Sequence, residues 1–274
     1  MPGGRPAGRA GAVIAGLLAA GTPALLASQV AANRAVLYLH PTDVADARAV
    51  WVNPAGLAVL RQASIHLDLT VRDPGEQGRL RQVTAGFSSR GLGFSYQRDA
   101  FDAGVTGHTY RLGFAGAEGG FAAGFAAALY RGDASATGWD VGLVYALHQA
   151  VTIGGAVSNL GEPDVRGARL PVTFVPGATV APLGPPLALS GHALITRDSV
   201  SGYAFGARVS LEWPAPVAAL VRLDTDRSLR RAAFAFGISV GTQDILGAVL
   251  TAPGDLGTPD AVSVHGLVIR PLAR

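Results

Sequence analysis

The sequence predicts an all-β fold, a single closed antiparallel transmembrane β-barrel of about 14 strands. Three observations carry this prediction: an alternation of period two from about residue 61 onward, a shortage of charge, and the placement of polar residues on the face opposite the aromatic one. Charged residues make up only 15% of the 274 residues and hydrophobic residues 49%. Soluble domains carry about 25% charged residues, so this chain has too few charges to cover an ordinary wetted surface.

Residues 1–32 are predicted to be a secretory signal peptide. Arg5 and Arg9 give a positive start, and an uncharged stretch rich in Ala, Leu and Gly follows. Small residues at Ala31 and Ala32 offer a cleavage site. The alternative is an uncleaved membrane anchor. The signal peptide implies that the mature chain leaves the cytoplasm.

From residue 61 to the C-terminus the chain alternates between apolar and small or polar residues. In the stretch 64–71, for example, Ile65, Leu67 and Leu69 share one face, whereas His66 and Asp68 lie on the other. Such alternation is typical of strands with two different faces. About fourteen segments follow this pattern, centred near residues 67, 84, 94, 112, 125, 142, 154, 176, 191, 207, 221, 235, 247 and 266. Short turn signals separate them, so neighbouring strands are expected to pair as antiparallel hairpins.

The two faces distinguish a membrane barrel from a soluble sandwich. Charges fall mainly in turns or on the face that bears Gly, Ala, Ser and His. The aromatic residues join the aliphatic face, as at Tyr96, Tyr110, Trp139, Tyr203 and Trp213. This pattern is typical of an outer-membrane barrel, whose apolar face meets lipid and whose closure leaves no unpaired edge in the bilayer. The alternative is a soluble exported β protein.

A neutral motif precedes the first strand, in the stretch DVADARAVWVNPAGLAVL of residues 43–60. This stretch resembles the N-terminal segment of the outer-membrane fatty-acid transporter (FadL-type) family, and equally that of the related PorV/PorQ-type barrels. The matching positions are Asp46, Ala47, Ala49, Asn53, Pro54, Ala55, Gly56, Leu57 and Ala58. The resemblance implies that residues 33–60 form a plug inside a barrel made by residues 61–274.

The motif also has a physical interpretation. Pro54 fixes its own φ and favours an extended Asn53, and the Asn53 side chain can cap a turn. Ala55 and Leu57 flank Gly56, which permits a close approach of backbone to backbone. The motif is therefore expected to turn the chain from the plug into the first strand. The alternative is an ordinary turn without a gating role.

Charged residues of both signs are predicted to face the lumen. These are Asp68, Arg111, Asp140, Arg208, Glu212, Arg222 and Asp224. They either pair with one another and rigidify the barrel, because buried charges need a partner or water, or they form a polar constriction that filters solutes.

Pro176 and Gly177 lie in the middle of one expected strand. Proline cannot donate to the β-ladder, so it is expected at a bulge or an edge. FadL-type proteins release apolar substrates sideways through a gap in the wall, and Pro176 could mark such a kink in this barrel. The alternative is a simple bulge.

Several classes of function find no support in the sequence. All 22 basic residues are Arg and are scattered, unlike the basic patch of a nucleic-acid-binding protein, and the absence of Cys excludes thiolate chemistry. No catalytic motif stands out, so no enzyme activity, cofactor or metal site is predicted. The final residue, Arg274, departs from the aromatic residue with which barrels of this kind usually end.

The expected function is passive passage of small, hydrophobic molecules across the bacterial outer membrane. The expected partners are outer-membrane lipid and such solutes. The PorV-like alternative is a barrel that does not transport and instead docks a secretion-system protein.

Overall fold

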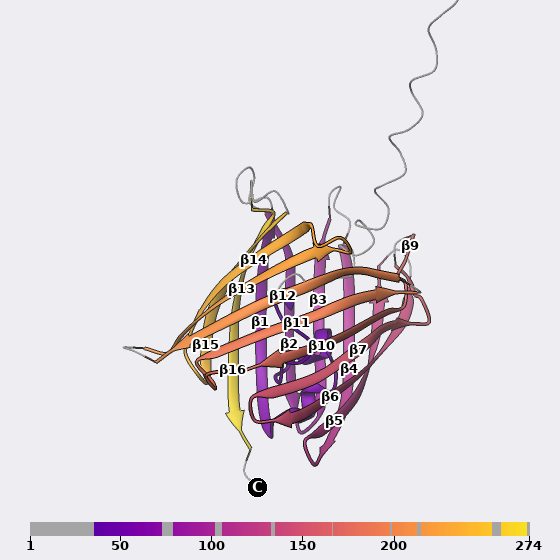
Figure 1. Ribbon diagram of the computed structural model, residues 1–274. Coiled ribbons are helices and arrows are strands. Elements are labelled where there is room, and N and C mark those ends of the chain that lie inside the picture. Colours follow the sequence, from indigo (N-terminus) through magenta and orange to yellow (C-terminus); the bar gives the residue numbers. More distant parts are fainter. Residues whose placement is uncertain are drawn as a thin grey trace, which may run out of the picture.

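The structure is a computed structural model that describes residues 36–72, 79–101, 106–132, 135–165, 167–197, 199–212, 215–253 and 259–272. Fourteen antiparallel strands close a barrel (Figure 1). They are β1 (Gln62–Arg72), β2 (Arg79–Ser89), β3 (Leu92–Ala100), β4 (Thr106–Glu118), β5 (Phe121–Arg131), β6 (Ala136–His148), β7 (Val151–Leu160), β10 (Thr173–Val180), β11 (Leu187–Thr196), β12 (Ser199–Leu211), β13 (Val217–Asp226), β14 (Arg231–Val240), β15 (Asp244–Pro253) and β16 (Ala261–Pro271). Each of the fourteen predicted segments corresponds to one of these strands, so the predicted fold class is confirmed.

Every strand of the barrel pairs with its neighbour in the sequence, except where β7 pairs with β10. The ring closes between β1 and β16, from Gln62 opposite Pro271 to Arg72 opposite Ala261. Tight turns such as Arg90–Gly91, both at positive φ, join successive strands at one end, as the hairpin prediction requires. We call this end the turn end.

The two faces of the strands have opposite character. On β1, Ile65 and Leu67 point outward and are 62% and 49% exposed, whereas His66 and Asp68 point inward and are each 1% exposed. Lipid can cover the outer residues without loss of hydrogen bonds, so this polarity suits a membrane. Trp213, predicted for the outer face, lies outside the described residues. Among the residues that the structure describes, no helix has the length and apolar character needed to cross a membrane.

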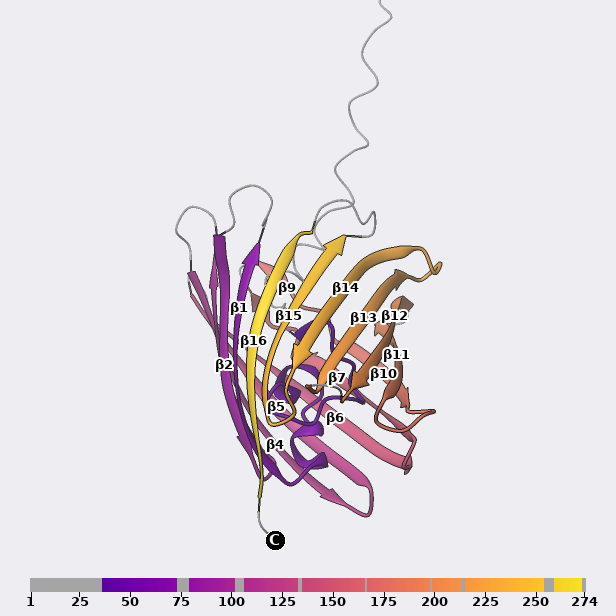
Figure 2. The ribbon, with the colours of Figure 1, turned by 90° about the vertical axis from the view of Figure 1, so that its left-hand side faces the viewer.

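The N-terminal segment, residues 36–60, lies inside the barrel (Figure 2). It contains two short helices, α2 (Ala49–Val52) and α3 (Gly56–Val59). Helix α2 packs against β3 and β4, and α3 packs against β3 to β6. The predicted signal peptide, residues 1–32, lies outside the described residues.

A small hairpin interrupts the connection between β7 and β10. Its strands are β8 (Asp164–Val165) and β9 (Ala168–Arg169), which pair only with each other. Val165 and Leu170 are buried against Ala128 and Tyr130 of the barrel wall. The sequence predicts only a short turn between β7 and β10 and does not predict this inward-folded hairpin.

Candidate functional site: the N-terminal segment within the lumen

Asn53 is the centre of the N-terminal segment's contact with the barrel wall. It is fully buried, and its Nδ2 donates to the carbonyl of Pro41 at 2.8 Å and to that of Leu143 on β6 at 3.2 Å. Its Oδ1 accepts from the backbone N–H of Ala55 at 3.1 Å. The side chain thus closes the local turn and ties the segment to the wall.

Glycines on the inner wall make room for this segment. A Cβ at Gly142 would collide with Asn53, and one at Gly124 would lie 2.7 Å from the Pro54 carbonyl. The same holds around the lumen for three more glycines, and at a fourth, Gly177, a Cβ would lie 3.2 Å from Pro41 Cγ. We call the six together the glycine seat: Gly93, Gly113, Gly124, Gly142, Gly177 and Gly206. The N-terminal segment therefore approaches the wall, with its backbone at Gly124 and with its side chains at the other glycines, at a distance that a larger inward residue would prevent.

Leu57 fills the next part of the seat. Its side chain is only 3% exposed and a Cβ at either Gly93 or Gly113 would lie 2.8 Å from it. Glycine is needed at position 56 for a different reason, because a Cβ there would collide with the carbonyl of Val44 within the N-terminal segment. Gly56 of the motif thus permits close packing within the segment, and Leu57 packs against the wall glycines.

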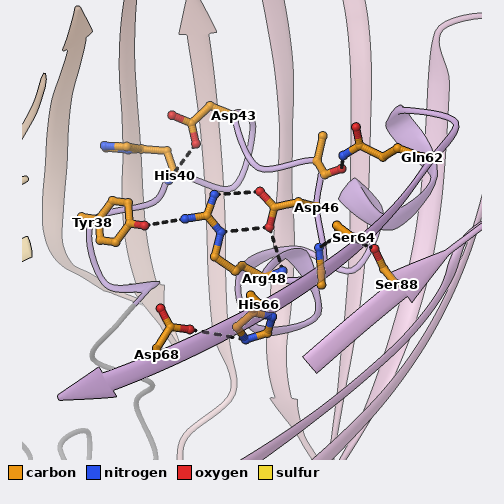
Figure 3. Close-up of polar contacts among 12 residues, drawn as sticks. Tyr38, His40, Asp43, Asp46, Arg48, Gln62, Ser64, His66, Asp68 and Ser88 are labelled. Atoms are coloured by element: carbon orange, nitrogen blue, oxygen red, sulfur yellow. Dashed lines mark hydrogen bonds and ion pairs between the residues drawn. The ribbon is translucent and has the colours of Figure 1, made fainter. Parts of the chain in front are cut away.

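A polar network holds the segment against β1 (Figure 3). Arg48 donates from Nε and Nη2 to the two carboxylate oxygens of Asp46, at 2.9 and 2.7 Å, and from Nη1 to the hydroxyl of Tyr38. The Ser64 hydroxyl of β1 accepts from the backbone N–H of Ala47 at 2.7 Å. In the same region, Gln62 donates to the Ala45 carbonyl at 2.7 Å. Charge-assisted bonds of this bidentate kind are stronger than neutral ones.

The electrostatics of this network favour the seated arrangement. Burial raises the pKa of Asp46, but the Arg48 guanidinium outweighs it, so the net effect is a pKa below the usual value. Burial also raises the pKa of the Tyr38 hydroxyl to about 12. Asp46 is therefore ionised and Tyr38 neutral at neutral pH, as their bonds with Arg48 require.

The opposite side of the segment bonds to the far wall. The Nδ1 atoms of His40 and His192 on β11 lie 3.0 Å apart, and Thr42 shares a 2.7 Å hydroxyl bond with Thr179 on β10. Arg222 on β13 donates to the Leu39 carbonyl at 2.8 Å. Burial, helped by the positive charge of Arg222, lowers the pKa of His40 to about 3, so this imidazole is neutral. The N-terminal segment therefore bridges the lumen from wall to wall.

The predicted lumen charges separate into three groups. Arg111 pairs with Asp140, and Arg222 pairs with Asp224 at 2.7 Å. Asp68 is buried with its carboxylate 3.5 Å from His66 Nε2.

Two candidates lie elsewhere. Arg208 is largely exposed and borders a cavity of about 220 Å³ together with Asp43. Glu212 follows the last residue of β12 and is exposed. Two of the seven predicted residues, Arg111 and Arg222, thus form ion pairs with Asp140 and Asp224, and the set does not form one ring of charge.

The N-terminal segment lies between two cavities. The hairpin cavity, of about 280 Å³, has a lining that includes Val36, Trp51, Tyr130, Leu170, Val175 and Leu194. The turn-end cavity, of about 790 Å³, has a lining that includes Val44, Leu60, Gly91, Gly120, Ala146 and Leu272. The hairpin cavity reaches the wall beside Pro176. Among the described residues, no group of three or more His, Cys, Asp or Glu side chains could hold a metal ion.

Strands β10 and β11 do not pair continuously. Phe174 lies opposite Ile195 and Gly177 opposite His192, but Val175 and Pro176 between them have no paired residue in β11. On the other side, Pro176 still pairs with Gly155 of β7. The wall therefore has a local break at the predicted kink, and Val175 lines both the break and the hairpin cavity.

The sequence reasoning missed part of this site. It did not identify the Arg48–Asp46–Tyr38 network, His40, or the purpose of the wall glycines. Arg48 and Asp46 stand two residues apart inside the motif, and that spacing could have indicated a local ion pair. The glycines share one face of alternating strands, but only the structure shows what each one faces.

Comparisons with known proteins place the fold. No protein-family model matches the chain, and a search of curated proteins finds no match. A Pseudomonas aeruginosa FadL homologue of known structure is similar with a TM-score of 0.53 and 11% identity, over 88% of this chain and 98% of that chain. The CymD monoaromatic hydrocarbon channel is similar with a TM-score of 0.55 and 9% identity, over 86% and 95%. The fold is thus the one seen in these two proteins, and the apolar outer wall is of the kind that meets lipid in a membrane barrel.

Proposed function

We propose that this barrel gives small, uncharged hydrophobic molecules a passive route across the outer membrane. The observation that carries the proposal is the hairpin cavity, which adjoins the break between β10 and β11. Its lining is rich in apolar and aromatic side chains, among them Trp51, Leu170 and Val175. Ligand sites for small molecules typically have such linings with a few polar groups.

The route that we propose runs from the end of the barrel that carries the β8–β9 hairpin into the hairpin cavity, and then sideways through the wall into lipid. The N-terminal segment acts as a plug along the barrel axis, because it bonds to β1 through Ala47 and to β10 through Thr42, on opposite sides of the ring. An apolar solute has no need of the aqueous end of the barrel if it can leave between Val175 and Leu194. The CymD channel, whose fold is similar, is described as a monoaromatic hydrocarbon channel, which agrees with a solute of this class.

The test uses vesicles whose outer leaflet is lipopolysaccharide, a barrier to hydrophobic compounds. The rate of entry of an uncharged aromatic dye that fluoresces in lipid is measured with the wild-type barrel and with Pro176→Val. Valine restores a backbone N–H and is expected to complete the ladder, so entry should slow. The matched control is Ala178→Val, two residues along the same face, where pairing with Gly191 is continuous.

Equal slowing by both substitutions would contradict a route through the break, and no acceleration by the wild-type barrel would contradict the function itself. The docking role in protein secretion draws no support from the two structural neighbours.

A further inference from the structure

A chain of hydrogen bonds and one ion pair joins the β8–β9 hairpin to helix α2, on two sides of the hairpin cavity. Asn159, at the end of β7, donates from Nδ2 to the Pro171 carbonyl at 3.2 Å, next to Leu170. Its backbone N–H donates to Asp140 Oδ1 at 2.8 Å. The other carboxylate oxygen of Asp140 accepts from Arg111 Nη1, which also donates to the Val50 carbonyl of α2 at 3.2 Å.

Irregular backbone positions Asp140 and Asn159, and a contact with Trp51 positions Arg111. The β6–β7 register shifts between Trp139 and Val141, so Asp140 sits at a bulge that frees its carboxylate to face Asn159. Asn159 itself has a φ of 61°, an uncommon conformation for a residue other than glycine. At the other end, the Arg111 guanidinium lies 4.7 Å from the ring centroid of Trp51. Trp51 in turn donates to Ser95 Oγ at 2.8 Å.

The chain passes along the wall of the hairpin cavity. Leu170, Asn159, Arg111 and Trp51 all line it, and Asp140 is buried behind them with 4% exposure. A buried ion pair is strongly destabilised when one partner moves away, because the other charge is left without compensation. A shift of the hairpin that pulls on Asn159 therefore changes the hold of Asp140 on Arg111, and with it the hold on α2.

We propose that Asp140 and Arg111 are positioning residues that couple the β8–β9 hairpin to the N-terminal segment, so that displacement of the hairpin loosens α2. The transport consequence rests on the proposed function: a solute that lifts the hairpin to enter the cavity also loosens α2, whose Trp51 lines that cavity, while the rest of the segment stays bonded to the wall. The coupling between the hairpin and α2 does not depend on the proposed function, and the experiment below measures it without any solute.

The reporter is Trp51. The chain has three Trp residues, so Trp139→Phe and Trp213→Phe leave Trp51 as the sole emitter, and quenching by acrylamide reports its exposure in the folded, membrane-inserted protein. Leu170→Ala loosens the hairpin, because Leu170 is only 3% exposed and packs on Tyr130. Asp164→Ala, at an exposed site on the same hairpin, is the matched control.

With Asp140 present, Leu170→Ala should raise the exposed population of Trp51 about fivefold, the lower end of ordinary coupling between sites, and Asp164→Ala should leave it unchanged. In an Asp140→Asn background the Leu170→Ala effect should vanish. Arg111→Lys should abolish it too, because lysine keeps the charge but lacks the planar guanidinium, which lies over Trp51 and places Nη1 between Asp140 and Val50. This second background decides the matter if Asp140→Asn does not insert or already exposes Trp51 fully.

An equal Leu170→Ala effect in the parent, in Asp140→Asn and in Arg111→Lys would overturn the proposal. A purely structural role for Asp140 predicts that result, since it would lower barrel stability without changing how Trp51 responds to the hairpin. Loss of dye transport with intact coupling would instead count against the proposed function alone.

Discussion

Gly142→Ala is expected to unseat the N-terminal segment while leaving the barrel intact. The added Cβ would collide with Asn53 Oδ1 and lie 3.0 Å from Pro54 Cδ. Because Gly142 is an inward residue of β6, the methyl group has nowhere to go except into the space that Asn53 occupies. The strand itself tolerates alanine, so the cost falls on the segment.

The magnitude follows from the bonds that Asn53 makes. Its side chain takes part in three hydrogen bonds, to Pro41, Leu143 and Ala55. Each contributes about 1 kcal/mol, and overpacking a close contact costs about 1–3 kcal/mol. Since the segment can relax in part, we expect a net loss of about 3 kcal/mol, which shifts the balance between seated and displaced states about 100-fold.

The assay is efflux of a small trapped sugar from vesicles that carry the refolded protein. The seated segment should keep efflux low in the wild type, and Gly142→Ala should raise it. Gly266→Ala is the matched control, because a Cβ there meets nothing within 4 Å. Unchanged efflux in Gly142→Ala, with a correctly inserted barrel, would refute the reasoning that the glycine seat holds the segment.

Three further outcomes are expected. Leu67→Arg, on the outer face at the middle of β1, should lower the free energy of folding into vesicles by about 2–4 kcal/mol, measured by urea titration; no loss would mean that this face does not meet lipid. Since His40 has a pKa of about 3 when seated and an ordinary value of 6.5, release of the segment should become easier as pH falls below about 6.5, by up to about tenfold per pH unit. Sugar efflux measured between pH 7 and pH 4 should show this rise in the wild type but not in His40→Gln. Identical pH profiles in the two proteins would mean that protonation of His40 does not cause the release. Leu57→Ala should weaken the binding of the N-terminal segment to the glycine seat by about 2–5 kcal/mol and raise sugar efflux at neutral pH. Unchanged efflux would mean that α3 does not help to hold the segment in place.

The barrel could be predicted from the sequence because its determinants are local. Alternation along a single strand such as β1 already separates Leu67 from Asp68, and short turns force neighbours to pair. The motif at Asn53 was recognisable for a similar reason, since Pro54 and Gly56 restrict the backbone by themselves.

The seat and its bonds could not be predicted, because they join residues far apart in the sequence. Asn53 meets Gly142 and His40 meets His192 only once the ring has closed and the segment has entered it. The β8–β9 hairpin was missed for another reason: its two strands of two residues each are too short for a period to be visible.

The most direct test of the account compares two permeants with the wild-type barrel in lipopolysaccharide-containing vesicles. We expect an uncharged aromatic dye to enter faster than in vesicles without protein, while a trapped sugar of similar size stays inside. Such a result requires a path open to apolar solutes in a barrel whose axis is closed. Equal passage of dye and sugar would reveal an open aqueous pore, and passage of neither would reveal a closed barrel, and either result would contradict the account.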